Sequence, residues 1–305
     1  MVRNAHAQDL PSVTVGSKDF TEQIIISEMA GLLLENAGYG VELQLNLGGS
    51  GIVHAALVSG EIDTYLEYTG TALLVHLGMQ LPAATPGADM ATPMAEGTPM
   101  ADGTPMAGGG KDAIYDIVAS EYQSQFNLVW LEPWGFNNTY ALVMRTDRAT
   151  ELGITKISDL IGKEGDLTFG ATTEFVTRPD GLPGIEAAYG LDFREEVGMD
   201  SGLVYQAVDS GDVDVISAFA TDGRIPQLNL FTLEDDLGFF PPYFAAPVVR
   251  QELIDEAPEV ADVLNQLAGK IDNATMAAMN AQVDVDGMEA QDVASAFLQE
   301  QGLIS

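Results

Sequence analysis

Two aromatic residues occupy matching positions in two similar stretches of the chain. Tyr68 and Phe219 each follow a Ser-Gly pair, and each lies nine positions after the serine. In both stretches a helix-like run precedes the pair, and a strand-like run leads from it to the aromatic residue. An aromatic side chain at the C-terminal end of a strand lies where open α/β sheets bind ligands. The repetition predicts two similar α/β lobes that each offer a ring to a shared cleft; chance similarity of common α/β patterns is the alternative.

The scarce cationic residues are a second chemical signal. The sequence has 12 Lys and Arg against 46 Asp and Glu, which gives a formal net charge of −34. Lys18 is the only cation between positions 4 and 110, and Arg178 is the only one between positions 164 and 193. Each is a candidate for a binding role, and an ordinary ion pair with a nearby carboxylate is the alternative. The acidic balance excludes nucleic acid as a partner, because phosphate contacts require clustered Lys and Arg.

Residues for catalysis or metal binding are few. Cysteine is absent, which removes thiolate nucleophiles, thiolate metal sites and disulfides together. The three histidines, His6, His54 and His76, lack the spacing of metal ligands. We therefore expect no catalytic residue, no metal and no cofactor, and we predict that the protein is not an enzyme. No run approaches 18 apolar residues, so no transmembrane helix is predicted.

The elements that must position these residues follow from local patterns. A short apolar strand is predicted at Val13 to Gly16, followed by a helix that ends near Gly38. The order Asp19 to Glu22 is typical of a capping box, which places Lys18 in the strand-to-helix turn. The second half opens with a similar strand, Leu167 to Gly170, and the distance from the strand's glycine to the aromatic residue is 52 residues in the first half and 49 in the second. Both halves are therefore predicted to share one order of strands and helices.

We predict two lobes built from three stretches of chain. Residues 12–137 together with 222–305 form lobe 1, and residues 138–221 form lobe 2. The chain is expected to cross between the lobes near Trp134 to Tyr140 and to return at Thr221 to Arg224. A chain of 305 residues is long enough for two such units.

Residues 82–110 differ in kind from the rest of lobe 1. They are rich in Pro, Gly and Ala, and they repeat a six-residue unit that reads TPMAEG, TPMADG and TPMAGG. The segment has no aromatic or branched apolar residue with which to build a core, so we predict a surface insertion. The regularly spaced methionines leave open a soft metal site or a partner site.

Seven segments of the chain resemble the glycine betaine/choline/carnitine-type (osmoprotectant) substrate-binding proteins of ABC transporters. In chain order they are GSKDFTEQ (Gly16 to Gln23), LGGS (Leu47 to Ser50), EYTGT (Glu67 to Thr71), TRPDGLPG (Thr177 to Gly184), YQAV (Tyr205 to Val208), ATDGRI (Ala220 to Ile225) and FPPY (Phe240 to Tyr243). They span nearly the whole chain outside residues 82–110, and the combination of EYTGT with RPDGLP is highly specific. The insertion is a departure from the family pattern.

The resemblance implies a ligand site. In that family an aromatic cage holds a quaternary ammonium group, while Lys, Arg and Thr hold the ligand's carboxylate. The implied residues are Tyr68, Tyr140, Tyr205 and Phe219 for the cage, Lys18, Thr71 and Arg178 for the carboxylate clamp, and Asn138 for a contact from the crossing strand. Phe219 replaces a tyrosine that is common at its position. A methylated ammonium forms no hydrogen bonds, so rings must recognise it, each contact contributing roughly 0.5–2 kcal/mol; an ordinary core aromatic is the alternative for each ring.

The resemblance also implies the fold and the biological setting. The expected fold is α/β, a two-lobed periplasmic-binding-protein fold of type II, with the ligand cleft between lobes joined by two crossings. The expected protein is an extracytoplasmic, monomeric substrate-binding protein of an ABC importer, which hands its ligand to a membrane permease; lipid anchoring before processing stays open. Glycine betaine is the first choice of ligand, and choline or carnitine is the alternative. An enzyme or a sensory module on the same architecture is a further alternative.

Overall fold

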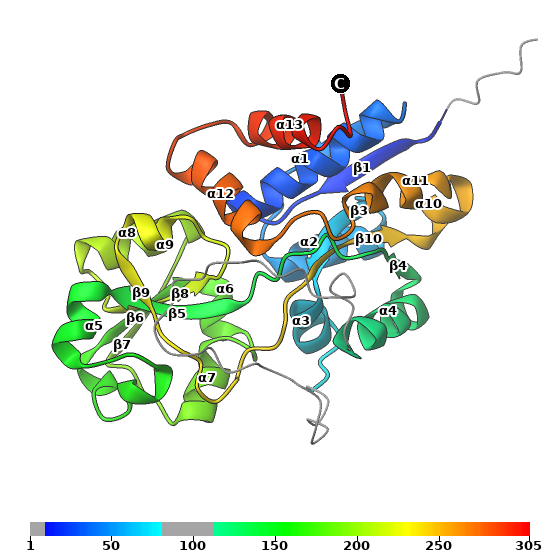
Figure 1. Ribbon diagram of the computed structural model, residues 1–305. Coiled ribbons are helices and arrows are strands. Elements are labelled where there is room, and N and C mark those ends of the chain that lie inside the picture. Colours follow the sequence, from blue (N-terminus) through cyan, green and yellow to red (C-terminus); the bar gives the residue numbers. More distant parts are fainter. Residues whose placement is uncertain (1–9, 81–112) are drawn as a thin grey trace, which may run out of the picture.

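The computed structural model describes residues 10–80 and 113–305, so the predicted insertion at residues 82–110 lies outside the described part. Two five-stranded sheets form two lobes, which lie side by side and are joined by extended segments (Figure 1). Each sheet is covered by helices on both faces. Within the described residues, no helix is long and apolar enough to cross a membrane.

The first lobe contains the two ends of the described chain. Its elements are β1 (Ser12–Gly16), α1 (Thr21–Asn36), β2 (Gly40–Gln44), α2 (Ser50–Ser59), β3 (Thr64–Tyr68), α3 (Thr69–Thr71), the π-helical turn η1 (Ala72–His76), α4 (Ala113–Phe126), β4 (Leu128–Trp130), β10 (Ala245–Arg250), α10 (Gln251–Glu256), α11 (Glu259–Leu264), η4 (Asn265–Leu267), α12 (Asn273–Asp284) and α13 (Ala290–Glu300). Helices α1, α11, α12 and α13 cover one face of the sheet, and α2 and α4 cover the other. The central strand β3 is therefore buried along its whole length.

The second lobe is continuous in sequence. Its elements are β5 (Tyr140–Arg145), α5 (Thr146–Leu152), η2 (Ile157–Leu160), η3 (Glu164–Asp166), β6 (Thr168–Thr172), α6 (Thr173–Thr177), α7 (Leu182–Tyr189), β7 (Glu195–Met199), α8 (Ser201–Ser210), β8 (Val215–Phe219), α9 (Arg224–Gln227) and β9 (Leu230–Thr232). Helices α5 and α7 pack on one face of its sheet, and α8 packs on the other.

The two sheets have equivalent strand orders. The order is β2-β1-β3-β10-β4 in the first sheet and β7-β6-β8-β5-β9 in the second. In both, the first three strands are parallel and the fourth is antiparallel to its neighbour. Strands β3 and β8, which end in Tyr68 and Phe219, occupy the same central place. The predicted α/β class and two-lobed fold are confirmed.

The two crossings run antiparallel beside each other. Asn137 and Phe244 form an isolated antiparallel bridge, and the Asn138 N–H donates to the Tyr243 carbonyl at 3.0 Å. Paired in this way, the two segments form a single hinge at the back of the cleft. The second crossing therefore lies at residues 241–244, next to the first.

This position corrects the predicted return crossing at Thr221 to Arg224 and the predicted lobe boundary at residues 221 and 222. Residues 230–232 still belong to the second sheet, because β9 pairs with β5. The predicted segment does touch the first lobe, since Asn280 donates to the Thr221 carbonyl at 2.9 Å. The chain then turns back through α9 instead of crossing.

The predicted capping box at the start of α1 is also wrong. The N-cap residue is Phe20, and no side chain caps the helix. Glu22, the expected capping partner, is instead buried with its carboxylate pointing at the junction of the two lobes. The turn after β1 consequently places the Phe20 ring at the edge of the sheet.

Candidate functional site

A cavity of about 360 Å³ lies between the lobes. Seven of the eight predicted site residues line it: Lys18, Tyr68, Thr71, Asn138, Tyr140, Arg178 and Phe219. The eighth, Tyr205, lines a smaller neighbouring cavity of about 160 Å³. Lys18 and Phe219, which are 201 positions apart in the sequence, therefore meet at one cleft.

Aromatic rings from both lobes line the larger cavity. Tyr68 ends β3, and Phe219 ends β8, where it pairs with Tyr140 across the strands. The ring centroids of Tyr140 and Phe219 are 5.2 Å apart. Phe20 from the first lobe stacks on Phe219 from the second at 5.3 Å, with planes inclined by 10°. Rings from the two lobes therefore meet face to face.

Phe20 is one of two lining aromatic residues that the predicted site did not include, and Tyr243 is the other. Phe20 follows the turn after β1, at the same sheet edge as Tyr68, and the ring centroids of Phe20 and Tyr68 are 6.3 Å apart. Its position two residues after Lys18 was a usable signal, because that turn was already expected to face the cleft.

Lys18 is held by a buried carboxylate of its own lobe. Its Nζ lies 2.5 Å from Oε1 of Glu67 and 3.1 Å from the Ser50 hydroxyl oxygen, and the side chain is almost wholly buried. Glu67 also accepts hydrogen bonds from Tyr65 and pairs with His76 at 2.9 Å. Burial alone would raise the pKa of Glu67, but Lys18 and His76 outweigh burial and hold that pKa below its ordinary value. The ammonium is thus fixed beside the Tyr68 ring face, 5.1 Å from its centroid.

Arg178 is held in the second lobe by a two-point contact with Asp180. Its Nε and Nη2 lie 2.6 and 2.7 Å from the two carboxylate oxygens. Nη1 donates to the Tyr140 hydroxyl at 2.8 Å, and Nη2 reaches Thr71 of the first lobe at 3.2 Å. The guanidinium also contacts Glu174 at 3.4 Å. Arg178 therefore links the lobes and lies 5.2 Å from the Tyr140 ring centroid.

Glu22 is a second buried carboxylate at the junction. Tyr68 and Asn138 donate to its Oε1 at 2.7 and 2.8 Å, Asn280 donates to Oε2 at 3.2 Å, and the Thr221 hydroxyl also donates to Oε2. Burial raises its pKa despite these four donors. The contacts join a cavity ring, the first crossing, the second lobe and α12, so Glu22 couples the cavity to the hinge.

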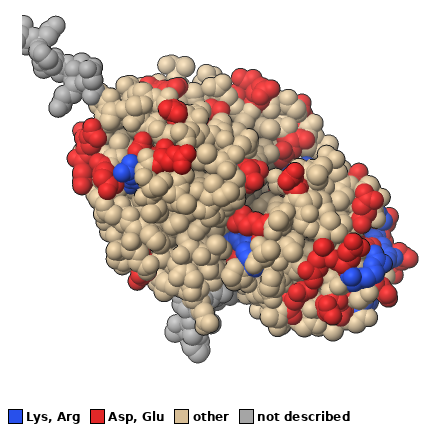
Figure 2. All heavy atoms as spheres, turned by 180° about the vertical axis from the view of Figure 1, so that it is seen from behind, with Lys and Arg blue, Asp and Glu red and all other residues tan. Residues whose placement is uncertain are grey.

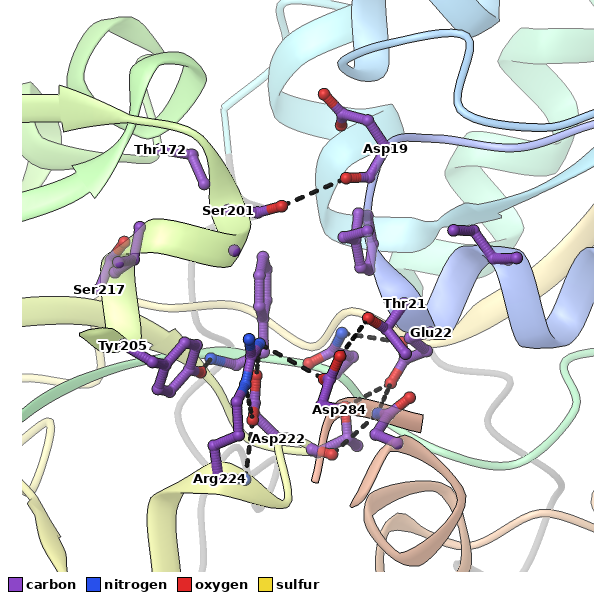
Figure 3. Close-up of a pocket in the computed structure, with 18 residues that line it drawn as sticks. Asp19, Thr21, Glu22, Thr172, Ser201, Tyr205, Ser217, Asp222, Arg224 and Asp284 are labelled. Carbon is purple, nitrogen blue, oxygen red and sulfur yellow. Dashed lines mark hydrogen bonds and ion pairs between the residues drawn. The ribbon is translucent and has the colours of Figure 1, made fainter. Parts of the chain in front are cut away.

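Tyr205 lies in the smaller cavity, and an arginine covers its ring. The Arg224 guanidinium is 3.9 Å from the Tyr205 ring centroid and forms a two-point contact with Asp222. Figure 3 shows this group from the second lobe facing Asp284 of α12, which lies 3.5 Å from Arg224. The Tyr205 hydroxyl accepts a hydrogen bond from the Phe219 N–H at 3.4 Å. Tyr205 thus supports a cavity residue from behind.

A glycine in the EYTGT segment allows close packing at the cleft. A Cβ atom on Gly70 would lie 2.6 Å from the Tyr243 ring. The absence of that atom lets Tyr243 reach Asp180 with its hydroxyl at 2.7 Å. Because Asp180 holds Arg178, the glycine contributes indirectly to the position of the guanidinium.

Carboxylates line the cavity together with the two cations. Asp19, Glu174 and Asp200 line it in addition to the paired charges described above. Figure 2 shows acidic side chains spread over both lobes and near the hollow between them, while Lys and Arg gather mainly at the outer end of one lobe. The site therefore combines ring faces, two fixed cations and a negative surrounding field.

The fold and the site define a two-lobed α/β binding protein with a ring-lined cleft. A model of the substrate binding domain of ABC-type glycine betaine transport systems matches residues 11–300. The chain belongs to that family.

Three similar proteins illustrate the relationship. A glycine-betaine-binding protein of Pseudomonas aeruginosa is 37% identical, over 96% of this chain and 89% of that protein. An ergothioneine transport permease/ergothioneine binding protein of Helicobacter pylori is 34% identical over 99% of this chain, which spans only 49% of that longer protein. A crystal structure of a glycine betaine/carnitine/choline ABC transporter protein has a TM-score of 0.70 and 30% identity, over 96% of this chain and 100% of that one. The predicted family is confirmed.

Proposed function

We propose that this protein binds a quaternary ammonium solute, with glycine betaine as the first choice, and delivers it to the membrane permease of an ABC importer. One observation carries the proposal: rings and fixed cations from both lobes converge on a single cavity. The family relationship supports the transport role. Closure of the lobes over the solute is the expected mode of binding.

The ammonium group would lie among Phe20, Tyr68, Tyr140 and Phe219. Each ring offers a negative π-face, and a desolvated cation gains up to about 2 kcal/mol from such a face. Phe20 takes the place of Tyr205 in this version of the cage, because Tyr205 lines only the smaller cavity and the Arg224 guanidinium lies 3.9 Å from its ring centroid. Tyr205 would act from behind by holding the Phe219 backbone.

The ligand carboxylate would lie near Lys18, Ser50, Thr71 and Arg178. Their donors come from both lobes, so a carboxylate held by all of them favours the closed state. Glu67 and Asp180 neutralise the two cations and also fix their orientation, which lowers the entropy lost when a ligand binds. Asn138 would act through Glu22, to which its amide donates.

The setting follows from the same role. We propose an extracytoplasmic location, a monomer as the binding unit, and binding without turnover of the ligand. The two lobes complete one cleft within a single chain, so a second copy is not needed to build the site. The acidic surface favours solubility and disfavours self-association.

Isothermal titration calorimetry with glycine betaine, choline and carnitine tests the proposal, with proline and glucose as controls. We expect one site per chain and a dissociation constant on the order of 1 μM, about −8 kcal/mol, for the preferred solute. Choline or carnitine as the preferred solute would keep the class and change the ligand. Because one relative is named for ergothioneine, ergothioneine is the fourth ligand to titrate. Absence of heat and of a melting shift with every quaternary ammonium solute would refute the proposal.

A further inference from the structure

The α2 N-terminus is capped from the opposite lobe. Helix α2 has Gly49 at its N-cap and no side-chain cap of its own. The Glu174 carboxylate of α6 accepts the Ser50 N–H at 3.3 Å instead. A Cβ atom on residue 49 would lie only 2.8 Å from the Glu174 oxygen, so glycine leaves room for that carboxylate. An anion at a helix N-terminus is favoured by the exposed N–H groups and the helix dipole.

The same carboxylate touches the Arg178 guanidinium. Oε1 of Glu174 lies 3.4 Å from Nη1 of Arg178, while Oε2 faces Ser50 of the first lobe. Lys18 is close by, since its Nζ lies 3.1 Å from the Ser50 hydroxyl oxygen. Glu174 thus lies among the donors that would receive a ligand carboxylate.

Glu174 is held more loosely than the other carboxylates that contact these cations. The contacts of Glu67 and Asp180 with Lys18 and Arg178 measure 2.5 to 2.7 Å, and both acids are buried. The contacts of Glu174 measure 3.3 and 3.4 Å, and its side chain is 35% exposed. Charge-assisted hydrogen bonds normally measure about 2.7–2.9 Å, so Glu174 is the carboxylate that can leave.

We propose that Glu174 is a specificity-determining residue, a resident carboxylate that a zwitterionic ligand must displace and that a carboxylate-free cation leaves in place. This inference rests on the proposed function. With a betaine, two carboxylates compete for the same donors. With choline, Glu174 keeps its contacts and adds a negative charge near the ammonium. Glu174 therefore lowers the ratio of the affinity for a zwitterion, such as glycine betaine, to the affinity for a cation, such as choline.

Affinities of glycine betaine and choline for Glu174→Gln test the inference. Glutamine keeps the shape and can still accept the Ser50 N–H, but it carries no charge. We expect the ratio of betaine affinity to choline affinity to rise about fivefold to tenfold, because a charged competitor for the donors becomes a neutral one. Glu174→Asp keeps the charge and shortens the side chain, which weakens its contacts with Ser50 and Arg178, so we expect a smaller rise in the same direction.

Asp200→Asn is the matched control. Asp200 lines the same cavity, is exposed, and has no contact with Arg178 or Ser50 among those found in the described residues. Its loss should leave the ratio within about twofold. An unchanged or lower ratio in Glu174→Gln, or an equal rise in Asp200→Asn, overturns the inference, with melting temperatures used to confirm that each variant is folded. If the wild-type protein binds no quaternary ammonium solute, the proposed function itself fails, which is a distinct outcome.

Discussion

The two lobes share a sheet order but fix their cations in different ways. In the first lobe Lys18 lies over the Tyr68 ring and is held by Glu67, which is 49 positions away in sequence. In the second lobe Arg178 lies over the Tyr140 ring, 5.2 Å from its centroid. Its main partner, Asp180, is only two positions away.

The difference shows two solutions to one positioning problem. The first lobe depends on a long-range pair between a turn and the central strand, so its cation is placed only when the sheet has formed. The second lobe uses a local contact within the RPDG segment, supported by Tyr243. We therefore expect the first half-site to be tied to global stability and the second to be more independent of it.

The largest expected effect comes from breaking the long-range pair. Glu67→Gln leaves Lys18 buried without its carboxylate, which should lower the free energy of unfolding by about 3–5 kcal/mol. Asp180→Asn should cost less, because Arg178 keeps hydrogen bonds to Tyr140 and Thr71. Urea unfolding at pH 7 measures both. Equal losses would show that the two anchors do not differ in the way proposed.

The second prediction compares the two cations in binding. Arg178→Ala should weaken glycine betaine binding by about 1.5–3 kcal/mol, the range of a charge-assisted hydrogen bond, and change choline little. Lys18→Ala should show the same selectivity together with a loss of stability, since Glu67 loses its cation. The double variant should lose less affinity than the sum, because either loss already weakens closure. Calorimetry with glycine betaine and choline on all three variants measures these effects. If a substitution weakens the binding of both ligands equally, the clamp is misassigned.

A third prediction concerns the pH dependence of stability that a histidine of the first lobe produces. His54 stacks on His76 at 4.2 Å, and burial lowers the pKa of His54 to about 4. Between pH 6.5 and 4 the unfolded chain therefore binds more protons at this site than the folded chain. Stability present above pH 6.5 is lost as pH falls toward 4, by roughly 1–2 kcal/mol after allowing for solvent screening.

His54→Phe provides the test. Phenylalanine retains a ring next to His76 but cannot bind a proton, so the loss of stability between pH 7 and pH 5 should shrink. Thermal unfolding at both pH values measures the effect in the variant and the wild type. An unchanged pH dependence would show that protonation of His54 does not cause the loss of stability.

The sequence predicted local elements well where apolar patterns were strong. Strands β1, β3 and β8 and the helix after β1 were found in this way, and the repeat around the two Ser-Gly pairs anticipated the equivalent sheet orders. Strand β9 was not predicted, because three residues are too few to show an alternation of apolar and polar side chains. For that reason the boundary between the lobes was predicted too early in the chain. Strand β7, with the sequence EEVGM, was not predicted either, because it is a half-exposed edge strand without an apolar pattern.

The candidate site was predictable in its residues more than in its contacts. Motif positions identified seven lining residues, but pairings across long distances, such as Glu22 with Thr221, depend on the packing of four separate elements. Arg224 covers the Tyr205 ring only because α9 turns back into the second lobe. Such contacts require the tertiary fold, which no local pattern carries.

The smallest expected effect concerns the difference between Tyr68 and Phe219, the two rings at equivalent strand ends. Tyr68 has a hydroxyl group fixed by Glu22, whereas its counterpart Phe219 has none. Phe219→Tyr keeps the π-face, so affinity for glycine betaine should change by less than about 1 kcal/mol, while Phe219→Ala should cost about 1–2 kcal/mol. Calorimetry with one ligand and three proteins is sufficient. If the two substitutions have equal effects, the ring face of Phe219 does not contact the ammonium, and the stack with Phe20 serves closure of the lobes alone.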